Sequence, residues 1–568
     1  MDRITRSLIE ELLRNQELES EGDPKDFEKL VNYASISNEY SKTFELDFVT
    51  VGDGNDTGID GIAIIVNGQL VEDIEEVDDL LDKNGSLEIT FVFTQAKTSS
   101  NFNSGEINTF IFGIKDFFAE SPRLVRNQDI QRFAEIADYI YSKAPDFKSN
   151  PNIIAYYITT GTWINDQNLV AVLKTGEDEL LEKNLFNEVK LIALGAKELI
   201  ALYRKTKETS LATINFSKRF TIPSINGISE AYIGLLPFEE FKKIIQDDNG
   251  KLKNVFEDNV RDFQGDTNDV NALINDTVSG DKSEVFSILN NGVTIVANTI
   301  SPTGDVFTIK DYQIVNGCQT SNVLYNNRLN PNIKNVYVPI KIIATDNEEI
   351  KTQITLATNN QTPIKKEQLA ALTVFQRNLE QFYNTYEGEN KLFYERRAKQ
   401  YNSSTNVIKT RIITVPIQIK SFSAMFLLNP HLVTSYFGAL VKKLNTDTSK
   451  IFKEDHSYIT YYISGLAYYK LETFFRRRLI DSKYKSIRFH ILMLFRLLTN
   501  NNSLPFLNSQ KNMEKFCEPI FVILNNDNIS LEYFTKCLEI IENSEFDYTD
   551  KQQIKQGTKT QVLIDYII

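Results

Sequence analysis

The chain has 568 residues, with 62 basic and 76 acidic side chains and a formal net charge of −14. A hydrophobic fraction of 42% excludes a disordered chain, and the length suits about three or four domains. The acidic balance excludes a protein that coats nucleic acid through bulk positive charge, so any such contact needs a local basic patch or a bound metal ion.

The chain has three widely spaced cysteines: Cys318, Cys517 and Cys537. They form no CxxC pair, so neither a disulfide framework nor a structural zinc site is expected, which fits a reducing compartment. Residues 1–16 have the pattern of an amphipathic helix without the apolar core of a signal peptide. The uncharged run 421–441 is interrupted at Pro430, so two packed helices explain it better than one membrane span. We expect a cytoplasmic protein without a membrane contact.

The first two hundred residues alternate between helical and strand-like patterns. Helices are predicted at 4–18, 24–40, 106–119, 127–143, 178–186 and 196–206, and strands at 43–51, 61–67, 89–97, 152–160 and 190–195. This alternation predicts an α/β fold in which helices flank a mainly buried sheet.

The pattern changes twice further along the chain. Short strands, polar loops and Asn-rich turns predict an α+β module after residue 206, and a mostly helical, aromatic region follows residue 430. The predicted domains are therefore 1–206, 207–430 and 431–568.

Residues that could take part in cutting a phosphodiester bond lie at one end of each of two predicted strands. Asp60 lies at the start of one strand, and Gln95 and Lys97 end the next. The acidic stretch 71–85 separates them and is expected to elaborate a hairpin. Because neighbouring strands bring their ends together, Asp60, Gln95 and Lys97 are expected to meet at one edge of the sheet.

These residue types suit hydrolysis with a bound divalent cation. The Asp60 carboxylate, the Gln95 amide oxygen and the Ala96 carbonyl are hard oxygen ligands of the kind that Mg²⁺ or Mn²⁺ prefers. The cation would polarise the scissile phosphate and lower the pKa of a bound water. Lys97 shares a strand face with Gln95 and would orient that water and offset developing charge. Glu28, on the preceding helix, is a further candidate ligand, directly or through a water.

Together these segments resemble the PD-(D/E)XK nuclease superfamily, and within it the Mrr-type restriction endonucleases. In that group a helix with a Glu precedes a G-hydrophobic-D strand and then a Q-x-K strand. The matching segments here are DFEKLV (26–31), TGIDGI (57–62) and FTQAK (93–97). The resemblance implies a restriction-endonuclease-like mixed sheet with flanking helices over about the first 200 residues, with the four side chains named above as catalytic residues.

The residues alone leave several points open. Glu39 is a second candidate for the Glu of the motif, and the nearby acids Asp56 and Glu106 either join the site or lie at the surface. An Asp-Gly pair often only forms a turn, and lysines are common at strand ends. Folds of this class also persist as binding modules, so the site is either active or ancestral.

Four blocks mark the central region: FEDNVRDFQGDTNDVNALINDT (256–277), FSILNNGVTIVAN (286–298), DYQIVNGCQTSNVLY (311–325) and ITLATNNQTPIKKEQLAA (354–371). In this order, and with FYERR (393–397), they resemble the AIPR family, named for abortive infection and phage resistance, over about 225–430. The resemblance implies bacterial antiviral defence and does not supply a reaction.

Polar residues of these blocks are candidates for binding an anion, a nucleotide or nucleic acid. A strand–Asn-Gly–helix turn presents backbone N–H groups at a helix N-terminus, and arginines can clamp phosphate or carboxylate. The candidates are Arg261, Asn291, Asn316, Gln319, Thr320, Asn360, Arg396 and Arg397. The alternative is that the Asn and Gly residues only form turns that need a positive φ. Because no histidine lies near Cys318 in the sequence, we predict a packed thiol there and not a nucleophile.

Basic residues form a cluster near the C-terminus, although the chain as a whole has a negative net charge. Its members are Arg476, Arg477, Arg478, Lys483, Lys485, Arg488 and Arg496. The cluster either contacts a phosphate backbone or forms a solvated helix face whose long side chains cover apolar surface.

The sequence as a whole predicts a metal-dependent DNA endonuclease of phage defence. The N-terminal domain would cut phage or host DNA with Mg²⁺ or Mn²⁺, under the control of the AIPR module. A homodimer is expected because nucleases of this class often pair to cut both strands, and an accessory defence-system protein is a further candidate partner. The alternative is a non-cleaving sensor that binds nucleic acid, a nucleotide or a phage component through the AIPR module.

Overall fold

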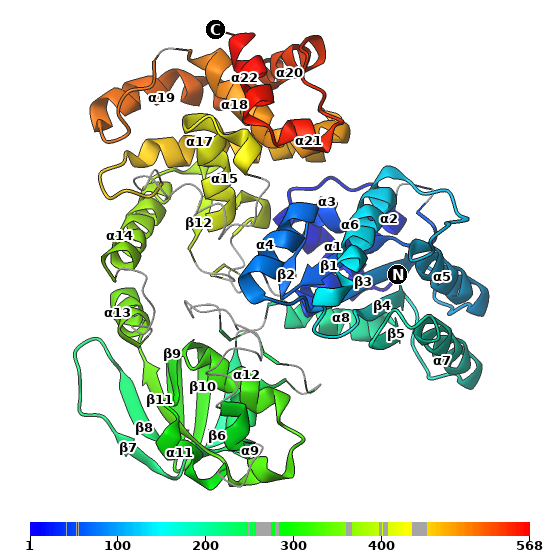
Figure 1. The fold of residues 1–568 in the computed structure, drawn as a ribbon, viewed down its shortest axis with the longest axis vertical. Helices are drawn as coiled ribbons and strands as arrows, with labels where there is room; N and C mark the ends of the chain where they lie inside the picture. The colour runs from blue at the N-terminus through cyan, green and yellow to red at the C-terminus, as the bar shows by residue number, and fades with distance from the viewer. Residues whose placement is uncertain are drawn as a thin grey trace. The chain divides into compact units, whose positions relative to one another are not determined.

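The structure is a computed structural model that describes residues 1–40, 42–52, 54, 56–207, 210–247, 250, 252–253, 255–256, 274–278, 283–358, 366–396, 400–401, 407–433, 451–501 and 503–567. The chain forms two compact units (Figure 1). Unit 1 comprises Met1–Asp82, Ser86–Thr206 and Val374–Ile568, and unit 2 comprises Lys83–Gly85 and Lys207–Thr373. Unit 1 is therefore built from both ends of the chain.

The N-terminal part of unit 1 is a five-stranded mixed sheet in the order β2-β1-β3-β4-β5. The strands are β1 (Gly61–Val66), β2 (Gln69–Leu70), β3 (Ile89–Lys97), β4 (Asn152–Thr159) and β5 (Glu188–Leu194). Strand β1 runs antiparallel to both of its neighbours, whereas β3, β4 and β5 run parallel. The predicted mixed α/β architecture is confirmed for this part of the chain.

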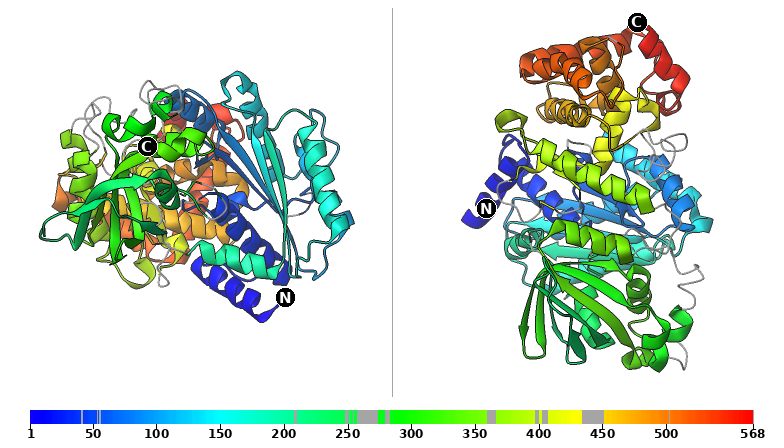
Figure 2. Two further views of the ribbon diagram at one scale, coloured as in Figure 1. Left: turned by 90° about the horizontal axis from the view of Figure 1, so that it is seen from below. Right: turned by 90° about the vertical axis from the view of Figure 1, so that its left-hand side faces the viewer.

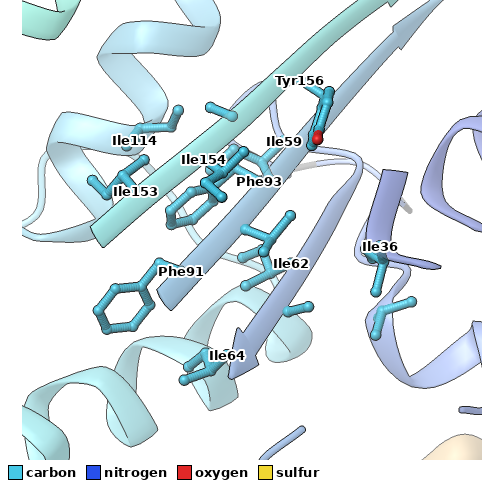
Figure 3. Packing of buried hydrophobic residues seen from close by; sticks show 14 of the residues in the cluster. Ile36, Ile59, Ile62, Ile64, Phe91, Phe93, Ile114, Ile153, Ile154 and Tyr156 are labelled. Atoms are coloured by element: carbon cyan, nitrogen blue, oxygen red, sulfur yellow. The ribbon is translucent and has the colours of Figure 1, made fainter. Parts of the chain in front are cut away.

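Helices cover both faces of this sheet (Figure 2). They are α1 (Arg3–Asn15), α2 (Asp23–Glu39), α3 (Leu46–Val49), α4 (Ile74–Asn84), α5 (Ser104–Phe117), α6 (Gln128–Ser142), α7 (Gln167–Leu181) and α8 (Ala196–Lys205). A sheet covered on both faces needs apolar side chains at successive strand positions, and every residue of β1 is buried. Figure 3 shows Ile62, Ile64, Phe91 and Phe93 packed in this core. Each such fully buried side chain contributes about 1.5–3 kcal/mol to folding.

Three predicted elements differ from the structure. The run 43–51 is predicted as a strand, but it contains the short helix α3, whose Phe48 ring packs against Phe133 of α6. Five alternating apolar residues fit either structure, and packing on α6 decides between them. The acidic stretch expected to elaborate a hairpin forms helix α4 after the short strand β2, and α7 begins at Gln167, well before the predicted 178.

Unit 2 is centred on a six-stranded sheet in the order β6-β10-β9-β11-β8-β7. Its elements are β6 (Leu211–Asn215), β7 (Arg219–Thr221), β8 (Glu230–Pro237), α9 (Phe238–Ile245), α11 (Phe286–Leu289), β9 (Val293–Thr303), β10 (Val306–Asn316), α12 (Cys318–Asn326), β11 (Tyr337–Ala344) and α13 (Glu348–Thr358). The pairs are antiparallel except β9 with β11. A separate apolar core lies between this sheet and α9.

The C-terminal part of unit 1 is mostly helical, as predicted. It contains α14 (Lys366–Tyr383, which begins in unit 2), β12 (Phe393–Glu395), β13 (Ile412–Thr414), α15 (Val415–Phe426), α17 (Tyr458–Arg476), α18 (Arg488–Thr499), α19 (Gln510–Leu524), α20 (Asp527–Asn543), α21 (Lys551–Ile554) and α22 (Gly557–Asp565). Helix α17 is buried along almost its whole length because α15, α18, α19 and α20 surround it. Within the described ranges, no helix has both the length and the apolar character needed to cross a membrane.

Candidate active site

Asp60, Gln95 and Lys97 meet where β1 begins and β3 ends. The last β1–β3 pair is Gly61 with Thr94, so Asp60 lies beside Gln95 just past the end of the ladder. One Asp60 carboxylate oxygen, Oδ2, accepts hydrogen bonds from Gln95 Nε2 at 2.5 Å and from the Ala96 N–H at 2.7 Å. Lys97 is near enough that its charge favours the ionised form of the Asp60 carboxyl and opposes the effect of burial on its pKa. The structure thus brings these predicted residues together.

A buried polar network holds the backbone of Asp60 from the opposite side of the sheet. Asn32 of α2 is fully buried, and its Nδ2 donates to the Asp60 carbonyl at 3.0 Å. Thr94 Oγ1 donates to Asn32 Oδ1 at 2.5 Å, and the Asp60 N–H donates to the Thr94 carbonyl at 2.9 Å. Sequence reasoning missed Asn32. Its signal is a polar residue on the apolar face of a helix, one turn after Glu28.

Glu28 reaches the site from α2, whereas Glu39 does not. Glu28 precedes Asn32 by one helical turn and so shares its face. Its carboxylate pairs with Lys25 Nζ at 3.0 Å and is buried. Glu39 lies at the other end of α2 and accepts a hydrogen bond from Tyr156 at 2.5 Å. Eleven residues of helix separate Glu39 from Glu28, which is about 16 Å at 1.5 Å per residue, so Glu39 lies away from Asp60.

The two buried carboxylates repel each other. Burial raises the pKa of Asp60 to about 6, against the opposing effects of the Ala96 N–H and Lys97. Burial and the charge of Asp60 raise the pKa of Glu28 to about 8, and Lys25 opposes this shift. Asp56 adds to both shifts. A bound cation would relieve this repulsion, so the charge distribution fits a divalent metal.

The donor set also fits a metal of the Mg²⁺ class. The Asp60 and Glu28 carboxylates supply hard oxygens, and the Ala96 carbonyl points to the same strand edge as its N–H. The Gln95 amide donates its nitrogen to Asp60 in the structure, and a half-turn of the amide would present its oxygen instead. Among the described residues, no three His, Cys, Asp or Glu side chains form a metal-binding group by themselves.

The other two acids near the motif lie at the rim of the site. Asp56 accepts a hydrogen bond from the Gly58 N–H at 2.8 Å and contributes its charge to the site. Glu106, at the start of α5, is exposed and accepts a hydrogen bond from Tyr157 at 2.9 Å. Tyr157 pairs with Gln95 across β3 and β4, so both side chains lie on the same face of the sheet. Sequence reasoning missed Tyr157 because its place depends on this register.

Substitution of Gly52 should disturb the site without disturbing the core. A Cβ at this position would overlap with Glu28 Oε1 and lie 2.8 Å from Glu28 Cδ, so Gly52→Ala must push the Glu28 carboxylate aside. We expect Gly52→Ala to lower any Mg²⁺-dependent cleavage rate by about tenfold or more, because small displacements of a catalytic group are costly. Plasmid cleavage rates measure the effect. Gly54→Ala, where a Cβ has open space, is the control, although its positive φ adds some strain.

In unit 2, three of the four AIPR blocks come together around the start of α12. Gly317 has φ +99°, and a Cβ there would lie 2.8 Å from Val293 Cγ2, so the turn needs glycine. Thr320 Oγ1 donates to Asn290 Oδ1 at 3.2 Å, and Asn316 Nδ2 donates to the Thr358 carbonyl at 2.7 Å. Gly317 therefore agrees with the alternative that the Asn and Gly residues of these blocks form turns that need a positive φ.

The remaining candidates of the AIPR blocks are placed differently. Asn291 is exposed and Gln319 is half-buried, whereas Cys318 is buried as predicted. Arg396 forms an ion pair with Glu380 at 2.5 Å and is largely buried, so its guanidinium holds the fold and does not face solvent. Three candidates lie outside the described residues: Arg261, Asn360 and Arg397.

The basic cluster pairs with acids inside unit 1. Its ion pairs are Arg476–Glu45, Arg477–Asp527, Arg478–Glu21, Lys483–Glu542, Lys485–Asp47 and Arg488–Glu472. Several of these pairs join the helices to the N-terminal part and line a groove of about 1010 Å³ that also reaches Lys25 and Glu28. Arg476 and Arg488 are largely buried against these acids, whereas Arg477, Arg478 and Lys483 stay exposed and form a solvated face, as one of the two predicted roles expects.

Comparison with known proteins supports only one part of the chain directly. No curated protein and no solved structure matches this sequence. The sequence model of the AIPR protein family matches residues 256–552, which is slightly more than half of the chain and spans parts of both units. All the predicted AIPR blocks lie within this match. The match begins later than the predicted span of about 225–430 and extends further toward the C-terminus. The chain belongs to the AIPR family.

Proposed function

We propose that this AIPR protein is a metal-dependent DNA endonuclease, with the N-terminal part of unit 1 as a PD-(D/E)XK domain of the Mrr-like type. Membership of the AIPR family is consistent with a role in phage defence. The proposal is carried by one observation: Glu28, Asp60, Gln95 and Lys97 converge at one edge of a mixed sheet flanked by helices. We further propose that two copies act together to cut both strands and that the AIPR module controls the cut.

The side chains divide the chemistry between them. Asp60, Glu28, Gln95 and the Ala96 carbonyl would hold Mg²⁺ or Mn²⁺, which supplies Lewis acidity toward the scissile phosphate. Lys97 Nζ, on the same face as Gln95, donates a hydrogen bond to the attacking water or to a phosphate oxygen and offsets developing negative charge. Asn32 and Thr94 fix the Asp60 backbone, and the side chains of Asp60, Glu28 and Gln95 are buried.

Plasmid cleavage by the full-length protein tests the proposal. Cutting is expected in Mg²⁺ or Mn²⁺ and not in EDTA, and Asp60→Ala and Lys97→Ala should each lower the rate by at least about 10²-fold. Glu39→Gln is the matched control, since this acid lies on the same helix as Glu28 but away from the site. Metal-dependent cutting that persists in both variants would refute the site. Tight DNA or nucleotide binding without any cutting would favour the sensor alternative.

A further inference from the structure

Two loops follow the ends of β3 and β4 beside Lys97, and together they form one fixed surface. This β3–β4 loop surface comprises residues 98–103 and 160–165. The Thr160 N–H donates to the Lys97 carbonyl at 3.2 Å, and Thr160 Oγ1 donates to the Thr98 carbonyl at 2.8 Å. A Cβ on Gly161 would overlap with the Ser100 carbonyl, so glycine allows the loops to approach this closely.

An aromatic pair forms the centre of the β3–β4 loop surface. Phe102 and Trp163 make a T-shaped contact with ring centroids 4.8 Å apart, and Trp163 Nε1 donates to Asn165 Oδ1 at 2.7 Å. Both rings are only partly buried. The indole is therefore held in place while part of it stays accessible. A pre-positioned aromatic ring of this kind can stack on a planar ligand without a large entropic cost.

Tyr157 connects this pair to the candidate active site. Its ring lies 6.3 Å from that of Phe102, centroid to centroid, and it pairs with Gln95 in the sheet. Burial, the hydrogen bond to Glu106 and the charge of Asp60 all raise the pKa of Tyr157. Tyr157 thus contacts Phe102 and shares a sheet face with Gln95, so the β3–β4 loop surface borders the site.

The charge of these loops differs from that of the rest of the chain. Residues 96–105 and 159–165 contain Lys97 and no acidic residue, within a protein of net charge −14, and the acids Glu106 and Asp166 follow directly at the start of α5 and α7. The exposed side chains of Thr98, Ser99 and Ser100 offer hydroxyl groups, and Ile164 is 76% exposed beside Trp163. A polyanion is repelled less by these loops than by the acidic run 71–82, and an exposed apolar side chain beside an aromatic ring suits contact with a base.

We propose that an unpaired nucleobase of the DNA strand stacks on Trp163, against Ile164, and so seats the neighbouring phosphate at Asp60 and Lys97. This inference rests on the proposed function and names its substrate class as single-stranded or locally unpaired DNA. Stacking on an aromatic side chain is tolerant of sequence, so the surface selects unpaired bases and not a base sequence.

The fluorescence of Trp163 tests the stacking directly, because it is the only tryptophan of the chain. Full-length wild-type protein in Ca²⁺, a hard cation that takes the same oxygen ligands, is titrated with a single-stranded 15-mer of thymidine, an abasic 15-mer and a 15-base-pair duplex. The thymidine oligomer is expected to quench the fluorescence saturably and to bind more tightly than the other two. Equal binding of the abasic oligomer, tighter binding of the duplex, unchanged fluorescence on binding, or no binding of the thymidine oligomer would each overturn the proposal.

Variants of the same surface give an independent measurement. By anisotropy of a labelled thymidine oligomer, Trp163→Ala should weaken binding by about 5- to 150-fold, whereas Trp163→Phe retains most of the affinity. Ile164→Ala removes an exposed side chain, so a loss of affinity there cannot come from misfolding. Affinity within twofold of wild type in both alanine variants would overturn the proposal. Stacking in a protein that never cuts DNA would refute the proposed function and leave this inference standing.

Discussion

Asp60→Asn is expected to abolish metal-dependent cleavage and at the same time to raise the thermal stability of the metal-free protein. The amide keeps an oxygen that can accept the hydrogen bonds of Gln95 and Ala96, so the local geometry is retained. It removes a buried negative charge beside Glu28, and the cost of burying that charge outweighs the opposing effects of the Ala96 N–H and Lys97. The loss of activity would therefore come with a gain in the midpoint of thermal unfolding, measured in EDTA.

The response to metal separates this effect from a general stabilisation. Mg²⁺ bound at Asp60 stabilises the wild-type protein by about 2.7 kcal/mol when its concentration is 100 times its dissociation constant. We expect the unfolding midpoint of the wild type and of Glu39→Gln to rise with Mg²⁺ and that of Asp60→Asn to stay constant. If Mg²⁺ stabilised Asp60→Asn as strongly as the wild type, Asp60 would not be a metal ligand.

Arg411→Ala is expected to destabilise unit 1 strongly, because it leaves the largely buried Glu17 carboxylate without its counter-charge. Arg411 Nε donates to Glu17 Oε1 at 2.8 Å, and its Nη1 donates to the carbonyls of Gly388 and Glu389. Glu17 follows α1, whereas Arg411 precedes β13, so the pair joins the two ends of the chain. Removing one partner of a buried ion pair lowers the free energy of unfolding by about 3–5 kcal/mol.

Urea unfolding followed by Trp163 fluorescence reports this loss in unit 1. The effect should depend on pH with a definite sign. Burial alone would raise the pKa of Glu17, but the hydrogen bonds from Arg411, Thr410 and Tyr469 outweigh it and lower the pKa below its ordinary value of 4.5. The ionised pair therefore stabilises the fold above about pH 4.5, and this contribution is lost as the pH falls through the lowered pKa.

The difference in stability between wild type and Arg411→Ala should consequently be largest at pH 7 and shrink as the pH falls below 4.5. Glu17→Gln is the matched variant, since it removes the charge and keeps a hydrogen-bond acceptor. It should cost less than Arg411→Ala and make a second substitution at Arg411 less harmful. If Arg411→Ala lost as much stability below pH 4.5 as at pH 7, the packing of Arg411, and not its charge, would be responsible.

The strands that position the candidate site are readable from the sequence because each is a long apolar run. The predicted runs 61–67, 89–97 and 152–160 agree closely with β1, β3 and β4. Asp60, Gln95 and Lys97 stand at the ends of such runs, so their proximity follows from strand pairing alone. The choice of Glu28 over Glu39 required the structure, because only the packing of α2 on β3 decides which end of the helix lies beside Asp60.

Features that depend on contacts between distant parts of the chain could not be predicted from the sequence. Asn32 and Tyr157 look like ordinary polar and aromatic core residues until the register of β3 and β4 is known. Arg396 looked like a phosphate clamp because an unpaired arginine and one bound to Glu380 have the same local sequence. Likewise, the basic cluster is neutralised by acids such as Glu21, Glu45 and Asp47, which lie more than four hundred residues earlier in the chain.

The interrupted path of the chain through unit 1 has a consequence during synthesis. The ribosome completes Met1–Thr206 first, then makes Lys207–Thr373, and only afterwards releases Val374–Ile568, which finishes unit 1. At bacterial-type rates of about 5–20 residues per second, the sheet that bears Asp60 waits tens of seconds for its helices. During that interval Glu17 lacks Arg411 and the groove beside Glu28 lacks one wall. Completion of unit 1, and of the groove beside Glu28, is thus tied to the synthesis of Val374–Ile568.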